Sequence, residues 1–152
     1  MASKQAQKVS RFEYKVRDIL REFTGCEWDR SPHSGAGKIK GDLYCANDQY
    51  YYCFELKSYA DSPIQDNLLT AKSNNIYLWW EQTEREAKQS KRKPGLIFKK
   101  DRGKILIAVP EKCEFLNYIK LKTDLIPGDA ASLYVYEFES WLKYVGKEAL
   151  NG

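Results

Sequence analysis

The sequence has few of the residues that build a structural zinc site. Histidine occurs once in 152 residues, as His33, and no two of the four cysteines form a Cys-x-x-Cys pair. Structural zinc sites need closely spaced cysteine and histidine ligands, so the sequence argues against this class of protein. The cysteines are expected to stay reduced, as is usual inside cells. They are Cys26, Cys45, Cys53 and Cys113.

Long apolar runs are also missing. No stretch approaches the roughly 20 apolar residues that span a bilayer. The first residues, MASKQAQKVSR, contain no apolar segment of the kind that a secretory signal requires. We therefore expect a soluble protein of the cytoplasm, or of the host cell cytoplasm if the chain is phage-encoded, with no membrane partner.

What the sequence does contain is typical of one folded domain. Hydrophobic residues make up 43% and charged residues 30%, which argues against a disordered chain. Aromatic residues reach 14%, a value that favours a sheet-rich core. The net charge of +4 is modest, but lysine and arginine cluster in residues 88–93 and 99–104. Such clusters suit a phosphate backbone, although a solvated charged face is the simpler interpretation.

The order of predicted elements indicates an α/β fold with a mixed β-sheet. Apolar residues spaced by three and four predict an amphipathic helix from Val9 to Phe23, which Gly25 ends. Residues 1–8 are expected to be flexible, and residues 111–152 to form a C-terminal strand and helix extension. The further predicted elements are strands 26–30, 42–46 and 49–58, helix 75–90, strands 95–100, 104–110 and 132–138, and a last helix ending near Gly146.

One predicted hairpin carries charges that a buried sheet should exclude. An Asn-Asp pair suits a tight turn between the runs DLYCA and YYYCFELK. With a turn centred there, Asp42 lies opposite Cys53 and is the diagonal neighbour of Glu55, roughly 7–8 Å away. Alternation along the strand places Glu55 and Lys57 on that same face. A three-residue turn would instead send Asp42 to the other face.

Two carboxylates and one ammonium on one face of a hairpin suit phosphodiester hydrolysis. The acids can hold Mg²⁺, while the lysine orients or activates water and stabilises the negative charge that develops on phosphorus. The simpler alternative is that Glu55 and Lys57 form a surface ion pair, worth under about 1 kcal/mol. The aspartate upstream, entered from a glycine-rich loop, favours the metal site.

Asp42 followed by Glu55-Leu56-Lys57 resembles the PD-(D/E)xK nuclease motif, with Gly41 in the place of the often variable proline. Three short motifs are similar, more narrowly, to those of the archaeal type of Holliday junction resolvase and its phage relatives. These motifs are Phe12-Glu13, Arg30-Ser31-Pro32-His33-Ser34 and Gly41-Asp42-Leu43. The resemblance implies a restriction-endonuclease-like core, a central mixed β-sheet flanked by helices, in a single nuclease domain over residues 1–152. It also implies Mg²⁺ as cofactor, with Mn²⁺ able to substitute, four-way junctions or other branched DNA as substrate, and a homodimer.

The same resemblance implies roles for individual residues. The implied metal ligands are Glu13, Asp42, Glu55 and the main-chain carbonyl of Leu56. Lys57 would position the attacking water, and cleavage would leave a 5′-phosphate. Arg30, Ser34 and Gln82 are implied DNA or phosphate contacts. Lys38 and Lys40 would supply charge to a loop that closes over DNA, for which a plain flexible connector is the alternative.

Two questions stay open at the level of sequence. Ser10 and Glu13 fit a capping box, in which Glu13 would only stabilise the start of a helix. The longer loop at 34–42 and an insertion at 58–75 depart from the archaeal pattern, so junction, flap and duplex DNA all remain candidate substrates. The alternatives are another PD-(D/E)xK nuclease, of nicking, restriction-like or repair type, or a non-catalytic DNA-binding protein in which the acids are structural.

Overall fold

The computed structural model describes residues 3–32, 40–46, 49–60, 76–122 and 132–151. Within these ranges the chain forms three helices and seven strands. In chain order they are α1 (Lys4–Thr24), β1 (Trp28–Arg30), β2 (Leu43–Cys45), β3 (Tyr52–Tyr59), α2 (Ile76–Ser90), β4 (Lys93–Lys100), β5 (Leu106–Val109), β6 (Ile119–Lys122), β7 (Ser132–Glu137) and α3 (Phe138–Asn151). All the predicted helices and strands are present, and β6 is an additional strand.

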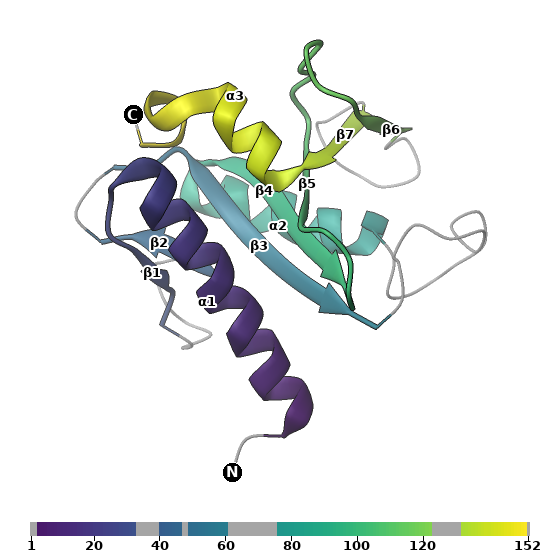
Figure 1. Cartoon of the computed structure of the whole chain (residues 1–152). Coiled ribbons are helices and arrows are strands. Elements are labelled where there is room, and N and C mark those ends of the chain that lie inside the picture. The colour runs from purple at the N-terminus through teal and green to yellow at the C-terminus, as the bar shows by residue number, and fades with distance from the viewer. Residues whose placement is uncertain (1–2, 33–39, 47–48, 61–75, 123–131, 152) are drawn as a thin grey trace.

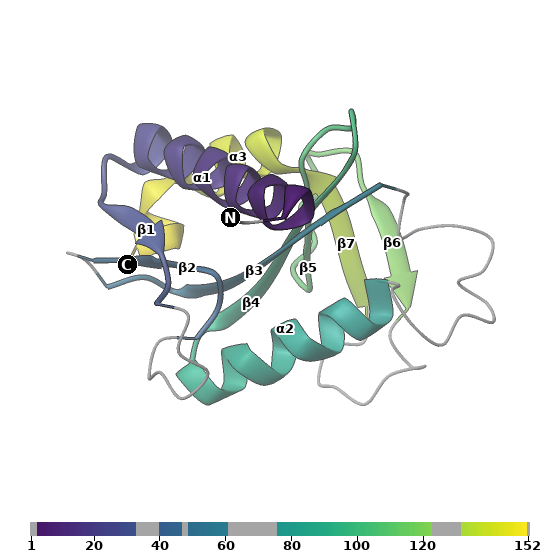
Figure 2. The same ribbon diagram turned by 90° about the horizontal axis from the view of Figure 1, so that it is seen from below.

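The seven described strands belong to one mixed sheet, in the order β1-β2-β3-β4-β5-β7-β6. Neighbouring strands are antiparallel except β3 and β4, which run parallel. A parallel pair needs a crossover connection, and α2 lies in the segment that makes it. Figures 1 and 2 show α1 and α3 on one face of the sheet and α2 on the other. The predicted α/β fold, a central mixed sheet flanked by helices, is therefore confirmed.

Helix α1 begins earlier than its apolar stripe indicates. The Ser3 side chain accepts a hydrogen bond from the backbone N–H of Ala6 at 3.1 Å and caps the helix. Residues 4–8, which we expected to be flexible, form the first turns. At the other end Gly25 adopts a φ of 72° and its N–H donates to the Arg21 carbonyl, as predicted for a C-terminal cap. The capping-box interpretation of Glu13 is wrong, because Glu13 lies in the third turn of the helix.

Two apolar clusters fill the spaces between the sheet and the helices. One joins α1 and α3 to the sheet and includes Phe12, Leu20 and Trp141. The other joins α2 to the opposite face and includes Trp79 and Trp80, which are 5% and 1% exposed. Such burial makes the two tryptophans core residues rather than platforms for stacking bases.

The C-terminal region contains the strand that the sequence analysis missed. β6 pairs with β7 at the edge of the sheet. Its sequence, IKLK, is short and mostly exposed, so it lacks the apolar run that reveals a buried strand. Gly146, with a φ of 74°, interrupts α3 at the predicted helix end, and helical residues continue to Asn151.

Candidate active site

The hairpin of β2 and β3 has a different register from the predicted one. Leu43 pairs with Phe54, and the backbone N–H of Asp42 donates to the Phe54 carbonyl at 2.7 Å. Continued by one residue, this register puts Asp42 opposite Glu55, so the predicted pairing of Asp42 with Cys53 is wrong. The shift spans two residues, which leaves Asp42 on the predicted face.

Regular β3 starts later than predicted, after a residue that contacts α3. The backbone N–H of Tyr51 donates to the Leu150 carbonyl at the end of α3. Regular β3 begins at the next residue, Tyr52, three residues later than predicted. The connection between the strands is longer than a two-residue turn; residues 47 and 48, on which that turn was predicted, lie outside the described residues. The longer connection moves Asp42 from a diagonal to a direct neighbour of Glu55.

Gly41 brings the chain close to β3 immediately before Asp42. Its φ is 84°, a left-handed conformation that side chains disfavour, and a Cβ at this position would lie 2.9 Å from the Phe54 carbonyl oxygen. Only glycine fits this approach without strain. The backbone at Gly41 therefore helps to fix the position of the Asp42 carboxylate.

The Asp42 carboxylate is anchored to the backbone of β3. Its Oδ2 accepts a hydrogen bond from the N–H of Leu56 at 2.7 Å. The N–H and C=O of one residue in a strand point to the same edge. The Leu56 carbonyl therefore also faces the edge where Asp42 lies, which is where the resemblance requires a main-chain ligand.

The side chains of Glu55 and Lys57, two residues apart on β3, share one face of the strand. The Glu55 side chain is 6% exposed. Its Oε1 accepts a hydrogen bond from Gln82 Nε2 at 3.1 Å and lies 3.7 Å from Lys57 Nζ. Two of the sequence-predicted residues, Gln82 and Lys57, thus contact a third. Because Glu55 is nearly buried, the pair is not the surface ion pair of the simpler interpretation.

The structure adds an acid that the sequence analysis missed. Glu86, one helical turn after Gln82 on α2, forms a hydrogen bond with the Glu55 side chain. The other Glu86 oxygen, Oε2, is buried and has no hydrogen-bond partner among the described residues. The signal was available in the sequence, since residues at i and i+4 share one helix face. Gln82 and Glu86 together present an amide and a carboxyl group to Glu55.

Glu13 and Arg30 form a second polar pair. Glu13 is 3% exposed, and its Oε1 accepts a hydrogen bond from Arg30 Nη2 at 2.9 Å. Arg30 also donates to the Tyr14 hydroxyl at 3.1 Å. The fold thus joins one predicted metal ligand to one predicted DNA contact, so Glu13 already has a cationic partner.

A single cleft of about 680 Å³ collects these groups. It lies between α1 and the β2–β3 hairpin, with residues of β3 along its floor. The sequence-predicted site residues that line it are Glu13, Arg30, Asp42, Glu55, Leu56 and Lys57. Lys40 is described but does not line the cleft. Ser34 and Lys38 lie outside the described residues.

Burial and charge repulsion make the two facing acids difficult to ionise. Burial raises the pKa of Asp42 to about 6, and the charge of Glu13 adds to this rise, while the hydrogen bond from Leu56 opposes it. Burial, followed by the charge of Asp42 and the Glu86 carboxyl, raises the pKa of Glu55 further, to above neutrality. Lys57 offsets only part of these effects. The positive charge in the cleft therefore balances the acids only in part.

The donor set fits a hard divalent cation. Carboxylate and main-chain carbonyl oxygens suit Mg²⁺, which is usually bound by one or two carboxylates and keeps several waters. Asp42, Glu55 and the Leu56 carbonyl supply donors of this kind. In the described part of the chain, no three His, Cys, Asp or Glu side chains already enclose a metal position. Water and substrate oxygens would then complete the coordination.

In the metal-free protein, we expect the free energy of unfolding to fall as pH rises from about 4 to about 6. The pKa of Asp42 is above its ordinary 3.8 in the folded state, so the folded protein keeps a proton that the unfolded chain releases. The stabilisation that this proton gives the folded state is complete below the ordinary pKa of 3.8 and is lost as pH passes about 6. It amounts to roughly 3 kcal/mol. Urea unfolding between pH 4 and pH 7, in buffer that contains a metal chelator, measures this change in the free energy of unfolding.

The matched variant for this measurement is Asp42→Asn, which cannot titrate. Its stability curve should lack the part of the slope that belongs to Asp42. Parallel curves for the two proteins across this pH range would contradict the raised pKa.

Comparison with known proteins identifies the family. A family described as "Phage putative PDDEXK endonuclease" matches residues 4–150. Protein D14 of Escherichia phage T5 is 40% identical over 158 residues, which cover 99% of each chain. The chain therefore belongs to the phage PD-(D/E)xK endonuclease family. No helix within the described ranges is long and apolar enough to cross a membrane.

A solved structure was also matched. The 1.6 Å structure of Hjc, a Holliday junction resolvase of Archaeoglobus fulgidus, aligns over 86% of this chain and 89% of its own, with 14% identity and a TM-score of 0.45. A TM-score below 0.5 does not establish a shared fold.

Proposed function

We propose that this protein is a Mg²⁺-dependent, structure-selective DNA endonuclease that resolves Holliday junctions. The observation that carries the proposal is the meeting of Asp42, Glu55 and Lys57 in one cleft, with Asp42 opposite Glu55. Family membership supports hydrolysis of phosphodiester bonds. The motifs at residues 12–13, 30–34 and 41–43 favour a branched substrate because they resemble those of junction resolvases.

Each group in the cleft has a role in the proposed reaction. Bound Mg²⁺, or Mn²⁺ in its place, would lower the pKa of a water and neutralise charge on the scissile phosphate. Asp42, Glu55 and the Leu56 carbonyl would hold the cation, with Glu13 contributing beside them. Lys57 would orient the attacking water and donate a hydrogen bond to the phosphate as negative charge develops.

The remaining groups would hold DNA and the acids in place. Arg30, fixed by Glu13 and Tyr14, is positioned to contact a phosphate at the rim of the cleft. Gln82 would restrain the Glu55 side chain or bind a water beside it. Ser34, Lys38 and Lys40 would contact the backbone of the cut strand, as the sequence analysis expects.

We further propose that the whole chain acts as one nuclease domain and works as a homodimer. Cuts at symmetric positions on two strands call for two sites related by a two-fold axis. None of the four cysteines forms a disulfide, and all four are buried, which suits the reducing cytoplasm of a host cell. The relative in phage T5 supports that location.

The proposal is tested with a panel of labelled DNAs of equal length: a four-way junction, a flap and a linear duplex. With Mg²⁺ or Mn²⁺, the wild-type protein should cut the junction fastest, and Asp42→Asn should abolish that cleavage. Uncut junctions would reject the resolvase function. Equal rates on linear duplex would favour a restriction-like or repair nuclease, and no cleavage of any DNA together with no metal binding would favour a non-catalytic protein.

A further inference from the structure

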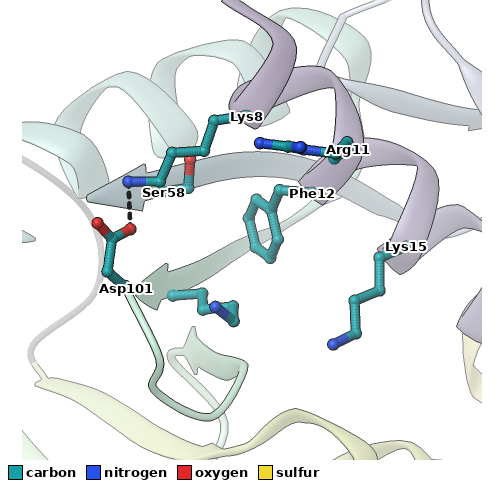
Figure 3. Close-up of a pocket in the computed structure, with 7 residues that line it drawn as sticks. Lys8, Arg11, Phe12, Lys15, Ser58 and Asp101 are labelled. Carbon is teal, nitrogen blue, oxygen red and sulfur yellow. Dashed lines mark ion pairs between the residues drawn. The ribbon is translucent and has the colours of Figure 1, made fainter. Parts of the chain in front are cut away.

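A second hollow lies on the opposite flank of α1 from the acidic cleft. Figure 3 shows this hollow, which has a volume of about 190 Å³. From α1 it is lined by Lys8, Arg11, Phe12 and Lys15, and from the sheet side by Ser58, Lys99 and Asp101. The acidic cleft takes different residues from the same helix: Ser3, Ala6, Val9, Ser10 and Glu13. Ser58 lines both hollows, so the two are neighbours over β3.

The second hollow is strongly basic. Four of its seven lining residues are cations, and Asp101 is the only acid among the described residues that line it. Asp101 forms an ion pair with Lys8, as Figure 3 shows. The Asp101 N–H also donates to the Tyr59 carbonyl, which holds the turn after β4 beside β3. One cation is therefore neutralised, and the excess positive charge belongs to Arg11, Lys15 and Lys99.

These three cations have no acidic partner in the described part of the chain. Among the described residues, Lys99 Nζ donates only to the carbonyl of Lys100, at 3.3 Å. Arg11 and Lys15 are exposed and form no ion pair with a described residue. Phe12, which lines the same hollow and is 6% exposed, packs into the core, so the helix that carries both cations is fixed to the sheet.

The other basic run of the sequence, residues 88–93, is used differently. Arg92 donates to the Tyr50 carbonyl at 3.2 Å, and its guanidinium lies 4.0 Å from the centre of the Tyr50 ring. Lys93 lies 5.9 Å from the centre of the Tyr52 ring. These cations stabilise the protein itself. Lys99, from the run at 99–104, instead lines the same hollow as Arg11 and Lys15 of α1, which are more than 80 residues earlier in the chain. Together they form a basic surface that can bind an anion.

We propose that Arg11, Lys15 and Lys99 bind the phosphate backbone of a DNA segment other than the strand being cut. The inference rests on the proposed function, because the acidic cleft must hold the cut strand. An α-helix with its side chains is about 10–12 Å across, which is close to the width of the major groove. α1 therefore separates two backbones, with the cut strand on its acidic flank and a second backbone on its basic flank.

Two sources of the second backbone are compatible with this spacing. It belongs either to the complementary strand of the same duplex or to another arm of a branched DNA. The chemistry of recognition, three cations on phosphate oxygens, is the same for both. Comparison of linear and branched probes separates the two sources.

The test uses Arg11→Gln/Lys15→Gln/Lys99→Gln and a control variant that removes equal charge elsewhere, Lys120→Gln/Lys122→Gln/Lys143→Gln. The control lysines are exposed on β6 and α3. Affinity for a four-way junction and for a linear duplex is measured by fluorescence anisotropy in EDTA at several salt concentrations. We expect the first variant to bind the junction about 10- to 100-fold more weakly at 100 mM salt. The slope of its log affinity against log salt concentration should correspond to about two to three fewer phosphate contacts. The control variant should bind like wild type.

The outcomes assign or overturn the surface. A loss on the junction alone assigns a second arm, and an equal loss on both DNAs assigns the complementary strand. An unchanged salt dependence, or an equal loss in the control variant, overturns the inference. Cleavage by the wild-type protein is measured separately: absence of cleavage rejects the proposed nuclease function, whereas normal cleavage with unchanged binding of the variant rejects only this surface.

Discussion

Replacing Lys57 by alanine is expected to slow DNA cleavage about 10²- to 10⁴-fold, the usual contribution of a group that aids proton transfer to or from a reacting water. Lys57 Nζ lies 3.7 Å from Glu55 Oε1 at the edge of the cleft. Alanine removes the amine from the water and from the phosphate, but leaves both acids of the metal site. Single-turnover cleavage of a labelled junction at saturating protein and Mg²⁺ measures the effect.

The matched control is Lys120→Ala, which removes one exposed lysine from β6. It should cut DNA at the wild-type rate. Thermal unfolding of both variants should match wild type, since Lys57 is only partly buried and its ion pair with Glu55 is long. Cleavage by Lys57→Ala within a few-fold of wild type would remove Lys57 from the mechanism, and binding of Mn²⁺ by this variant would show whether the metal site survives.

Replacing Gly41 by alanine should cause the largest loss of stability among the single changes considered. An alanine at a φ of 84° costs about 1–2 kcal/mol, because its Cβ crowds the following carbonyl. The same Cβ would meet the Phe54 carbonyl oxygen at 2.9 Å and Cys53 Sγ at 3.0 Å, which adds about 1–3 kcal/mol. Relief of the clash would move Asp42 away from Glu55, so cleavage should fall as well. Urea unfolding and single-turnover cleavage measure the two effects.

Gly25→Ala is the control for the backbone conformation. Gly25 has a similar φ of 72°, but a Cβ there would have no atom within 4 Å. It should cost only the conformational part, about 1–2 kcal/mol, and should leave cleavage intact. If the two alanine variants were equally stable and equally active, the close approach of Gly41 to β3 would have no role in placing Asp42.

Much of the fold follows from local sequence patterns. The apolar stripe of α1, the apolar runs of β3 to β5 and the glycine at the end of α1 all predict the observed elements, because periodicity and cap chemistry are local properties. The start of α1 was placed too late, since its first turns carry few apolar residues and the Ser3 cap has no buried partner to reveal it. β6 was missed for a similar reason: it has only four residues, and they are mostly exposed, so it shows no apolar run.

The site was predictable by residue type but not by arrangement. The motif places Asp42, Glu55 and Lys57 on one face whichever of the two registers is correct. The register itself depends on where β2 ends and regular β3 begins, at Cys45 and Tyr52, and the sequence of the turn alone does not fix these limits. The pairing of Glu13 with Arg30 and the approach of Glu86 to Glu55 likewise need the tertiary structure, because each joins residues of different elements.

The short length of β2 has a consequence for how such a site can exist in the middle of a sheet. β3 pairs with β4 along its whole length, but within the described residues it pairs with β2 only where Leu43 lies opposite Phe54. Beyond Phe54 this edge of β3 has no strand beside it among the described residues, and the Leu56 N–H donates to the Asp42 carboxylate instead. A β2 extended by a few residues would complete the ladder, satisfy those groups and leave nothing to receive a ligand. Reactivity here arises where regular pairing stops early.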